Sequence, residues 1–325
     1  MSGALRIAAR RCAAAVPTIL VVALAAFALL EAAPGDAVDA YLAQVGGDAG
    51  FAAELRARLG LADSLPGRLA GFLGRLASLD LGMSAAFARP VLEVIAERLP
   101  NTLLLMAGAA SVAAGLGVAI GLLSGARPGG ARDALLSTGA LALLAMPNFW
   151  LALVLVLVFA VQLGWLPTGG IRTIGGAPPG GAALDALRHL VLPSIALGAG
   201  YAAMFARTLR AGMVEAWHAD HVRAAHARGL RRRAIVWRAV ARPALVPVLA
   251  LLGQHVGTLV GGSVVVETVF AVPGMGRLAF EAVSGRDALL LAGILLCATG
   301  VVLVANLLVD LALARLDPRI GQSDG

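Results

Sequence analysis

The stretch EAWHADHVRAAHARGLRRRAIVWRAVARPALVPVL, from Glu215 to Leu249, joins an arginine-rich segment to the start of an apolar one. The apolar runs on either side, roughly 189–209 and 244–266, are each long enough to cross a bilayer as a helix of about 20 residues. From Arg207 to Arg242 there are nine arginines and only two acids, so the formal charge is 9 − 2 = +7, equal to that of the whole chain. Loops of this sign stay in the cytoplasm. We therefore expect a cytoplasmic loop over 210–243 between two transmembrane helices.

Four further apolar runs of similar length lie at roughly 12–30, 101–124, 134–163 and 288–313. The 325 residues are 59% hydrophobic and only 14% charged, which is far from the composition of an ordinary soluble domain. The sequence thus predicts one all-α polytopic membrane domain over 1–325, with six transmembrane helices. Although arginines precede the first run, it is longer than a signal-peptide core and five more runs follow, so we expect it to be retained.

An even number of spans places both termini on the same side as the arginine-rich loop, in the cytoplasm. The segment 31–99 is then external, and its six arginines and nine acids give −3. Within it we expect two short amphipathic helices. Asp48 would cap the first, and Pro66 would open the second. The second would carry these apolar residues on one face: Leu69, Phe72, Leu73 and Leu76.

All 26 residues in the Lys+Arg total are arginines, so the chain has no lysine. A phosphate-binding loop and Schiff-base chemistry both require lysine. Any ATP-driven work must therefore come from another polypeptide. Cys12 and Cys297 lie far apart in apolar runs, which is typical of small buried side chains and not of a disulfide or metal site.

Within the arginine-rich loop the spacing predicts a short helix followed by a glycine turn. Arg228 would lie in its last turn and Gly229 after it, since a cation and a glycine are both favoured at a helix C-terminus. Small residues at its centre suit insertion into a groove of another protein, although an amphipathic helix lying at the lipid headgroups is an equal alternative. The residues on one side of this helix are Val214, Trp217, His221 and Ala225.

Glycines recur every four residues in the fifth run, at Gly253, Gly257 and Gly261, and this spacing makes a groove along one helix face. Close backbone approach is important for helix pairing in lipid. Either ordinary packing within the chain or a surface for a second subunit would explain it. Gly117 and Gly121 have the same spacing in the second run.

The stretch HVRAAHARGL, followed by RPALVP, resembles the EAA loop of ABC importer permeases. The loop's small-residue core falls on Ala224 and Ala225, its glycine on Gly229 and its proline on Pro247. The rest of the chain resembles, in order, the B-type permeases of dipeptide, oligopeptide and nickel importers. The motifs that carry this resemblance are PGDAV (34–38), LGMS (81–84), RPVLEVIAERLPNT (89–102), PNFW (147–150), LGWLP (163–167), HLVLPS (189–194), ETVFAVPGMGRL (267–278) and NLLVDLALARLDPR (306–319).

This resemblance implies a type I importer permease of the bacterial inner membrane that carries peptides, or a related solute such as a nickel chelate. Its partners would be a second, C-type permease, two cytoplasmic ATPases, an extracytoplasmic substrate-binding protein and membrane lipids, with no nucleic acid. The chain would bind no cofactor and do no catalysis, since the ATPases would hold ATP and Mg²⁺. The ATPases would grip the loop through His221, Val222, Arg223, Ala224, Ala225, His226, Ala227, Arg228 and Gly229.

Two other classes are weaker. An ion-coupled secondary transporter would usually need a buried acid or acid–His relay near mid-membrane, whereas Asp310 lies close to a span end and His255 has Gln254 beside it. An intramembrane protease would need a GxSG or HExxH pattern inside a span, and neither is present. A metal site is also a weak prediction, because His218, His221 and His226 lack a convincing further ligand.

Overall fold

The computed structural model describes residues 3–32, 50, 64–176 and 181–316, and every regular element in these ranges is a helix. The expected helix capped by Asp48 lies outside the described residues. The chain divides into two compact units, one of residues 1–100 with 277–304 and the other of 101–276 with 305–325.

The first unit contains α1 (Gly3–Ala32), α4 (Leu65–Ala77) and most of α12 (Met275–Ser284) and α13 (Ala288–Leu316). Pro66 opens α4 as expected, since a proline in the first turn loses no helical hydrogen bond. The buried ring of Phe72 lies 5.7 Å from that of Phe27 on α1, and Arg68 pairs with Glu31 at 2.7 Å. The apolar face predicted for this helix is therefore the face that packs.

Asp287 caps α13 in the same unit. Its buried carboxylate accepts hydrogen bonds from the Ser84 hydroxyl at 2.5 Å and from the Leu290 amide at 3.0 Å. Ser84 ends the LGMS motif, so this motif holds the start of the last helix.

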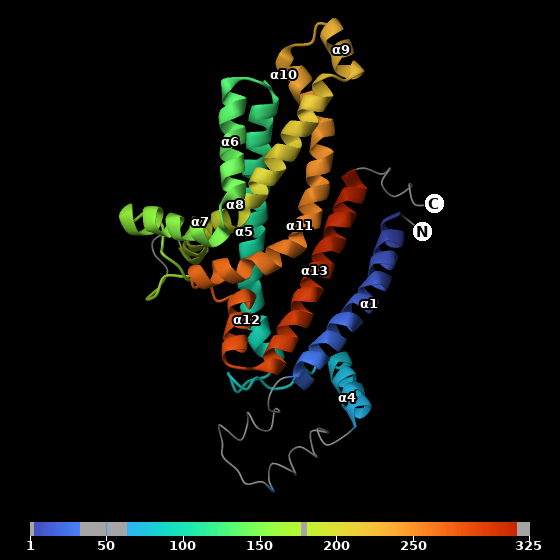
Figure 1. Ribbon diagram of the computed structural model, residues 1–325, viewed down its shortest axis with the longest axis vertical. Helices are drawn as coiled ribbons and strands as arrows, with labels where there is room; N and C mark the ends of the chain where they lie inside the picture. Colours follow the sequence, from blue (N-terminus) through green and yellow to red (C-terminus); the bar gives the residue numbers. More distant parts are fainter. Residues whose placement is uncertain (1–2, 33–49, 51–63, 177–180, 317–325) are drawn as a thin grey trace. The chain divides into compact units, whose positions relative to one another are not determined.

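The second unit is built around α8 (Gly181–Trp217), which packs against α5 (Val91–Gly125), α6 (Ala131–Ala145), α7 (Asn148–Leu155) and α11 (Arg242–Val269) (Figure 1). The apolar window of α8 is 67% buried, against 28% or less in the other long apolar helices. Glycines bring α5 close: a Cβ on Gly117 or Gly121 would lie 2.8 Å from the Cβ of Phe205 or Leu209.

The third predicted span differs from the expected continuous helix over 134–163. It consists of α6 and of α7 with a π-helical turn (Val156–Gln162), and the two parts meet at a bend of 106°. The bend falls at Met146–Pro147. A proline disfavours helical dihedrals in the residue before it, and Met146 is accordingly extended with ψ of 128°. Five described helices are long and apolar enough to span a membrane, or six if this bent pair counts as one.

Candidate functional site: the coupling loop

The loop after α8 forms three short elements: α9 (Asp220–Ala227), α10 (Arg232–Ile235) and a π-helical turn (Val236–Ala241) that leads into α11. Figure 1 shows α9 and α10 beyond the ends of α5 and α8. The single helix expected to run through Val214 and Ala225 is broken, because α8 ends at Trp217 and Ala219 is extended with ψ of 149°. The residues expected on one helix side are thus divided between two helices.

The short helix α9 buries one side of itself in the core of the spans. Val222 and Ala225 are 1% and 2% exposed, and they belong to the same apolar cluster as Met213 of α8, Ile235 of α10 and Val248 of α11. Because protein interiors are densely packed and resist deformation, a displacement of α9 is transmitted to α8 and α11.

The other side of α9 is open. Seven of the nine residues from His221 to Gly229 are exposed: His221, Arg223, Ala224, His226, Ala227, Arg228 and Gly229. Of the two alanines that map to the small-residue core, Ala224 faces outward and Ala225 inward. None of these seven is a large apolar residue and four are His or Arg; Asp220 before them and Leu230 after them are exposed as well.

Gly229 ends this element as the sequence predicts. Its φ is +72°, a left-handed conformation that glycine adopts without the strain of a Cβ. The amides of Gly229 and Leu230 donate to the carbonyls of His226 and Ala225 at 2.9 and 3.3 Å, so the glycine turn satisfies the last helical carbonyls. A Cβ on Gly229 would meet no atom within 4 Å, so only the backbone conformation requires glycine here.

Two side chains, those of Trp217 and Arg232, anchor the loop to the end of α5, and the sequence predicted neither contact. The indole Nε1 of Trp217 donates to the Gly125 carbonyl at 2.9 Å, and Arg232 donates to the Ala126 carbonyl at 3.0 Å. The Arg232 guanidinium also lies 5.1 Å from the centre of the Trp217 ring, a cation–π contact. Both partners are backbone carbonyls about 90 to 106 residues away, so no local pattern could have revealed them.

The three loop histidines each face a backbone carbonyl. His221 Nε2 lies 2.9 Å from the Ala239 oxygen, and the Nδ1 atoms of His218 and His226 lie 2.9 and 3.1 Å from the oxygens of Val214 and Val222. A ring nitrogen next to a carbonyl oxygen carries its proton and donates. His218 and His226 therefore bond to carbonyls four residues earlier in the chain, while His221 links α9 to the π-helical turn at Ala239.

A buried ion pair joins α6 to α8 near this end of the second unit. Arg210 donates to both carboxylate oxygens of Asp133, at 2.6 and 2.8 Å, and Asp133 also accepts from the Gly129 amide at 2.8 Å. Asp133 is 3% exposed. Such a two-pronged pair fixes α6 and the preceding turn against α8.

Two of the sequence motifs, 89–102 and 267–278, meet where α11 ends, beside the N-terminal third of α5. The buried carboxylate of Glu267 accepts from the Thr102 hydroxyl at 2.7 Å, and Asn101 donates to the Pro273 carbonyl at 2.7 Å. The Gly170 amide, from the loop after the bent pair, donates to the Phe270 carbonyl at 2.7 Å. We call these residues, with Met275, the α11–α12 latch.

The loop lies at the end of α5, and the latch contacts α5 at Thr102, inside its N-terminal third. From Thr102 to Gly125 the helix advances about 35 Å at about 1.5 Å per residue, close to a hydrocarbon thickness of about 30 Å. The latch and the loop are therefore separated along α5 by about one hydrocarbon thickness.

The glycines of the fifth run do not form one surface. Gly253 is buried against Val309 of α13, Gly257 is half-buried, and Gly261 is exposed with no atom within 4 Å of its would-be Cβ. The close approach of α5 and α8 at Gly117 and Gly121 is the tighter glycine contact.

The chain has several apolar helices long enough to span a membrane, and the loop helix α9 packs into the same apolar core as α8 and α11. This arrangement is typical of an integral membrane subunit of a transport system. The chain belongs to the family of binding-protein-dependent transport system inner membrane components, whose model matches residues 117–322. It is therefore a permease subunit of an ABC importer in the inner membrane.

Relatives and solved structures agree with this assignment. A putative peptide permease of Brucella ovis is 38% identical over 310 residues, covering 93% of this chain and 94% of the relative. The di/tripeptide transport system permease protein DppB of Pseudomonas aeruginosa is 37% identical, covering 96% and 97%. The oligopeptide transport system permease protein AppB of Bacillus subtilis is 33% identical, covering 96% and 98%. A structure of the MetNI methionine ABC transporter, 19% identical, has the same fold with a TM-score of 0.56 over 69% of this chain and 96% of that one.

Proposed function

We propose that the chain forms part of the translocation path of a peptide importer and is driven by ATPase subunits that grip α9. The proposal depends on one observation about α9. Val222 and Ala225 on one side of this helix are buried in the core of the membrane helices, while its other side is exposed. The peptide relatives, which align over nearly the whole chain, support the substrate class.

The alternative interpretation of the loop, a helix lying at the headgroups, fits the geometry less well. A helix in that position turns an apolar face toward the acyl chains. In α9 the apolar residues Val222 and Ala225 face the protein core, while the open side carries Arg223 and Arg228. A protein groove with acidic groups at its rim suits this side better.

The complete assembly would contain this chain, a C-type permease, two ATPases and a substrate-binding protein that delivers peptide at the latch side. Both termini and the loop 210–243 would lie in the cytoplasm, because nine arginines gather between Arg207 and Arg242. ATP and Mg²⁺ would be held by the ATPases, since the chain has no lysine for a phosphate-binding loop. Closure of the ATPases would move α9 and, through the shared apolar cluster, α8 and α11.

The function is tested by purifying the tagged chain from its native membrane and reconstituting the complex in liposomes. We expect the other permease, the ATPases and the binding protein to co-purify, and uptake of labelled di- and oligopeptides to require ATP and the binding protein. Uptake driven by a proton gradient without ATP would instead establish a secondary transporter and refute the proposal.

The proposed contact between the exposed side of α9 and an ATPase subunit is tested by cysteine substitutions at two neighbouring alanines. In a background without native cysteines (Cys12→Ala, Cys297→Ala), a short bismaleimide should cross-link Ala224→Cys to a cysteine introduced at the contact surface of an ATPase subunit. Ala225→Cys is the matched control, because Ala225 is 2% exposed and faces the core. Equal cross-linking of the two variants, or none from Ala224→Cys in the assembled complex, would contradict the proposed contact.

A further inference from the structure

One face of α11 is both exposed and polar along the membrane-spanning part of the second unit. Its exposed residues follow one another at intervals of four, three, four and three, which places them on one side of a helix. Two of the five are threonines, one is a glutamine and one is a glycine, and the fifth, Val265, is apolar and 47% exposed. We call this face the polar track; its members are Gln254, Thr258, Gly261, Val265 and Thr268.

The polar track differs from the surfaces that suit lipid. Between Val16 and Leu29 the exposed side chains of α1 are apolar apart from Thr18, and Leu308 of α13 is apolar and 62% exposed. The Thr258 and Thr268 hydroxyls each donate to a carbonyl of their own helix, both at 2.8 Å, and hydrocarbon can tolerate such hydroxyls. Hydrocarbon cannot hydrogen-bond, so an exposed amide such as that of Gln254 is costly at this depth. The side of α11 that carries Gln254 and Thr258 is therefore suited to water or to a polar solute.

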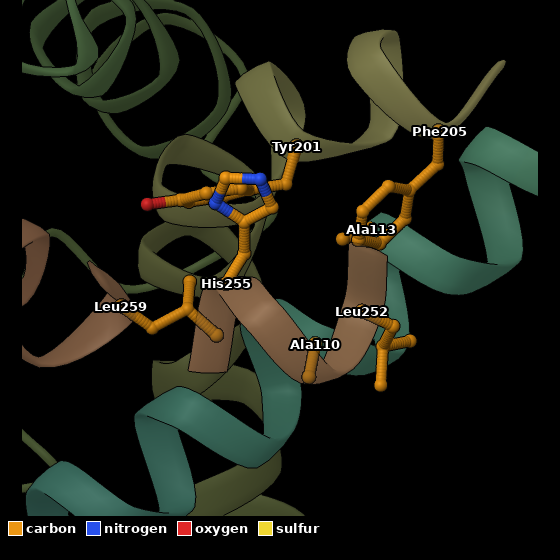
Figure 2. A pocket seen from close by; sticks show the side chains of 7 residues that line it. All are labelled: Ala110, Ala113, Tyr201, Phe205, Leu252, His255 and Leu259. Atoms are coloured by element: carbon orange, nitrogen blue, oxygen red, sulfur yellow. The ribbon is translucent and has the colours of Figure 1, made fainter. Parts of the chain in front are cut away.

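At the middle of the track lies a cluster of three hydrogen-bonding side chains. The Tyr201 hydroxyl of α8 donates to the Thr258 hydroxyl oxygen at 3.1 Å, and His255 Nδ1 lies 3.3 Å from the same oxygen. Figure 2 shows the Tyr201 and His255 rings side by side, with centroids 5.6 Å apart. They lie at one edge of a hollow that is otherwise apolar, lined by Ala110, Ala113, Phe205, Leu252 and Leu259.

The position of this hollow along α5 places it inside the membrane. Ala110 is eight residues from Thr102 in the latch and fifteen from Gly125 at the loop, or about 12 and 22 Å along the helix. Because the stretch from Thr102 to Gly125 is about one hydrocarbon thickness long, we infer that the cluster lies away from both membrane surfaces.

We propose that the polar track lines the translocation path and that Tyr201, His255 and Thr258 form a station where a passing peptide exchanges water for protein hydrogen bonds. This inference rests on the proposed importer function. The phenol, imidazole and hydroxyl offer both donors and acceptors, which match the amide and carboxylate groups of a peptide. The station lacks an acid or an arginine among its three side chains, so its contacts are weak enough for the solute to leave.

Water access to the track is tested by cysteine labelling of the assembled complex in membranes, in the cysteine-free background. A charged, membrane-impermeant methanethiosulfonate should label Thr258→Cys at least about tenfold faster than Leu308→Cys in one or more nucleotide states. Leu308 is a matched control, because it is exposed and apolar. It also lies at a similar depth: its neighbour Val309 packs at Gly253, which is five residues from Thr258 on α11. Equal rates, or no labelling of Thr258→Cys in any state because the second permease covers it, would overturn the inference.

Contact with peptide is tested by removing one hydroxyl. Thr258→Val should lower peptide uptake several-fold while assembly and ATP hydrolysis are kept, and saturating peptide should slow labelling of Thr258→Cys. Thr299→Val is the control, since its hydroxyl bonds only the Leu295 carbonyl of its own helix at 2.8 Å. Unchanged uptake by Thr258→Val together with unprotected labelling would refute the station. Failure of the cysteine-free parent to import peptide would instead refute the proposed function, and the labelling rates would still report water access.

Discussion

Replacing Gly229 with valine should reduce ATP-driven peptide uptake about tenfold, while the complex still assembles and hydrolyses ATP. A β-branched residue at a φ of +72° costs about 1–2 kcal/mol, which corresponds to roughly a 5- to 30-fold shift toward conformations in which the end of α9 is frayed. The turn that holds the carbonyls of Ala225 and His226 would open, and α9 would no longer move as one body with the spans. ATP hydrolysis and uptake, measured in the same proteoliposomes, give the coupling ratio.

A matched variant separates coupling from simple backbone strain. Gly164 has a φ of +62° and, like Gly229, open space around its would-be Cβ, but it lies just after the π-helical turn that ends at Gln162. Gly164→Val should therefore carry a similar strain and keep its coupling ratio. Gly229→Asn should keep most of the uptake, since asparagine tolerates left-handed dihedrals. Full coupling in Gly229→Val would count strongly against a role of this turn in transmitting motion.

Asp133→Ala should destabilise the protein by about 3 kcal/mol. The change leaves the Arg210 guanidinium and the Gly129 amide without the carboxylate that they share. Breaking a buried pair from one side typically costs about 3–5 kcal/mol, and the lower end applies because the Arg210 side chain is 35% exposed. Thermal unfolding in detergent would show the loss as a lower midpoint.

The exposed pair Asp220–Arg223 on α9 provides the control. Its side chains are 90% and 74% exposed, so Asp220→Ala should change stability by no more than about 1 kcal/mol. The double variant Asp133→Ala/Arg210→Met should recover part of the loss, because it removes the uncompensated charge. Equal midpoints for Asp133→Ala and Asp220→Ala would show that burial of the first pair is unimportant.

The predictable part of the fold followed from composition and local chemistry. Apolar runs indicated the helices, Pro66 marked the start of α4, and Gly229 marked the end of α9. The bend at Pro147 was missed, although its cause is equally local: the run 134–163 was apolar on both sides of the proline and was interpreted as one span. The break at Ala219 was missed because the helical spacing of apolar residues continues across it.

The class of protein was readable from the amino-acid sequence, because bilayer-length apolar runs and the arginines between Arg207 and Arg242 are properties of the chain that need no partner in space. Three features required the packed helices: which side of α9 is open, the bond from Trp217 to the Gly125 carbonyl, and the contact between Tyr201 and Thr258. These pairings join residues 92 and 57 positions apart. Many helix packings would satisfy the same hydrophobic pattern, and the close glycine contacts between α5 and α8 select one of them.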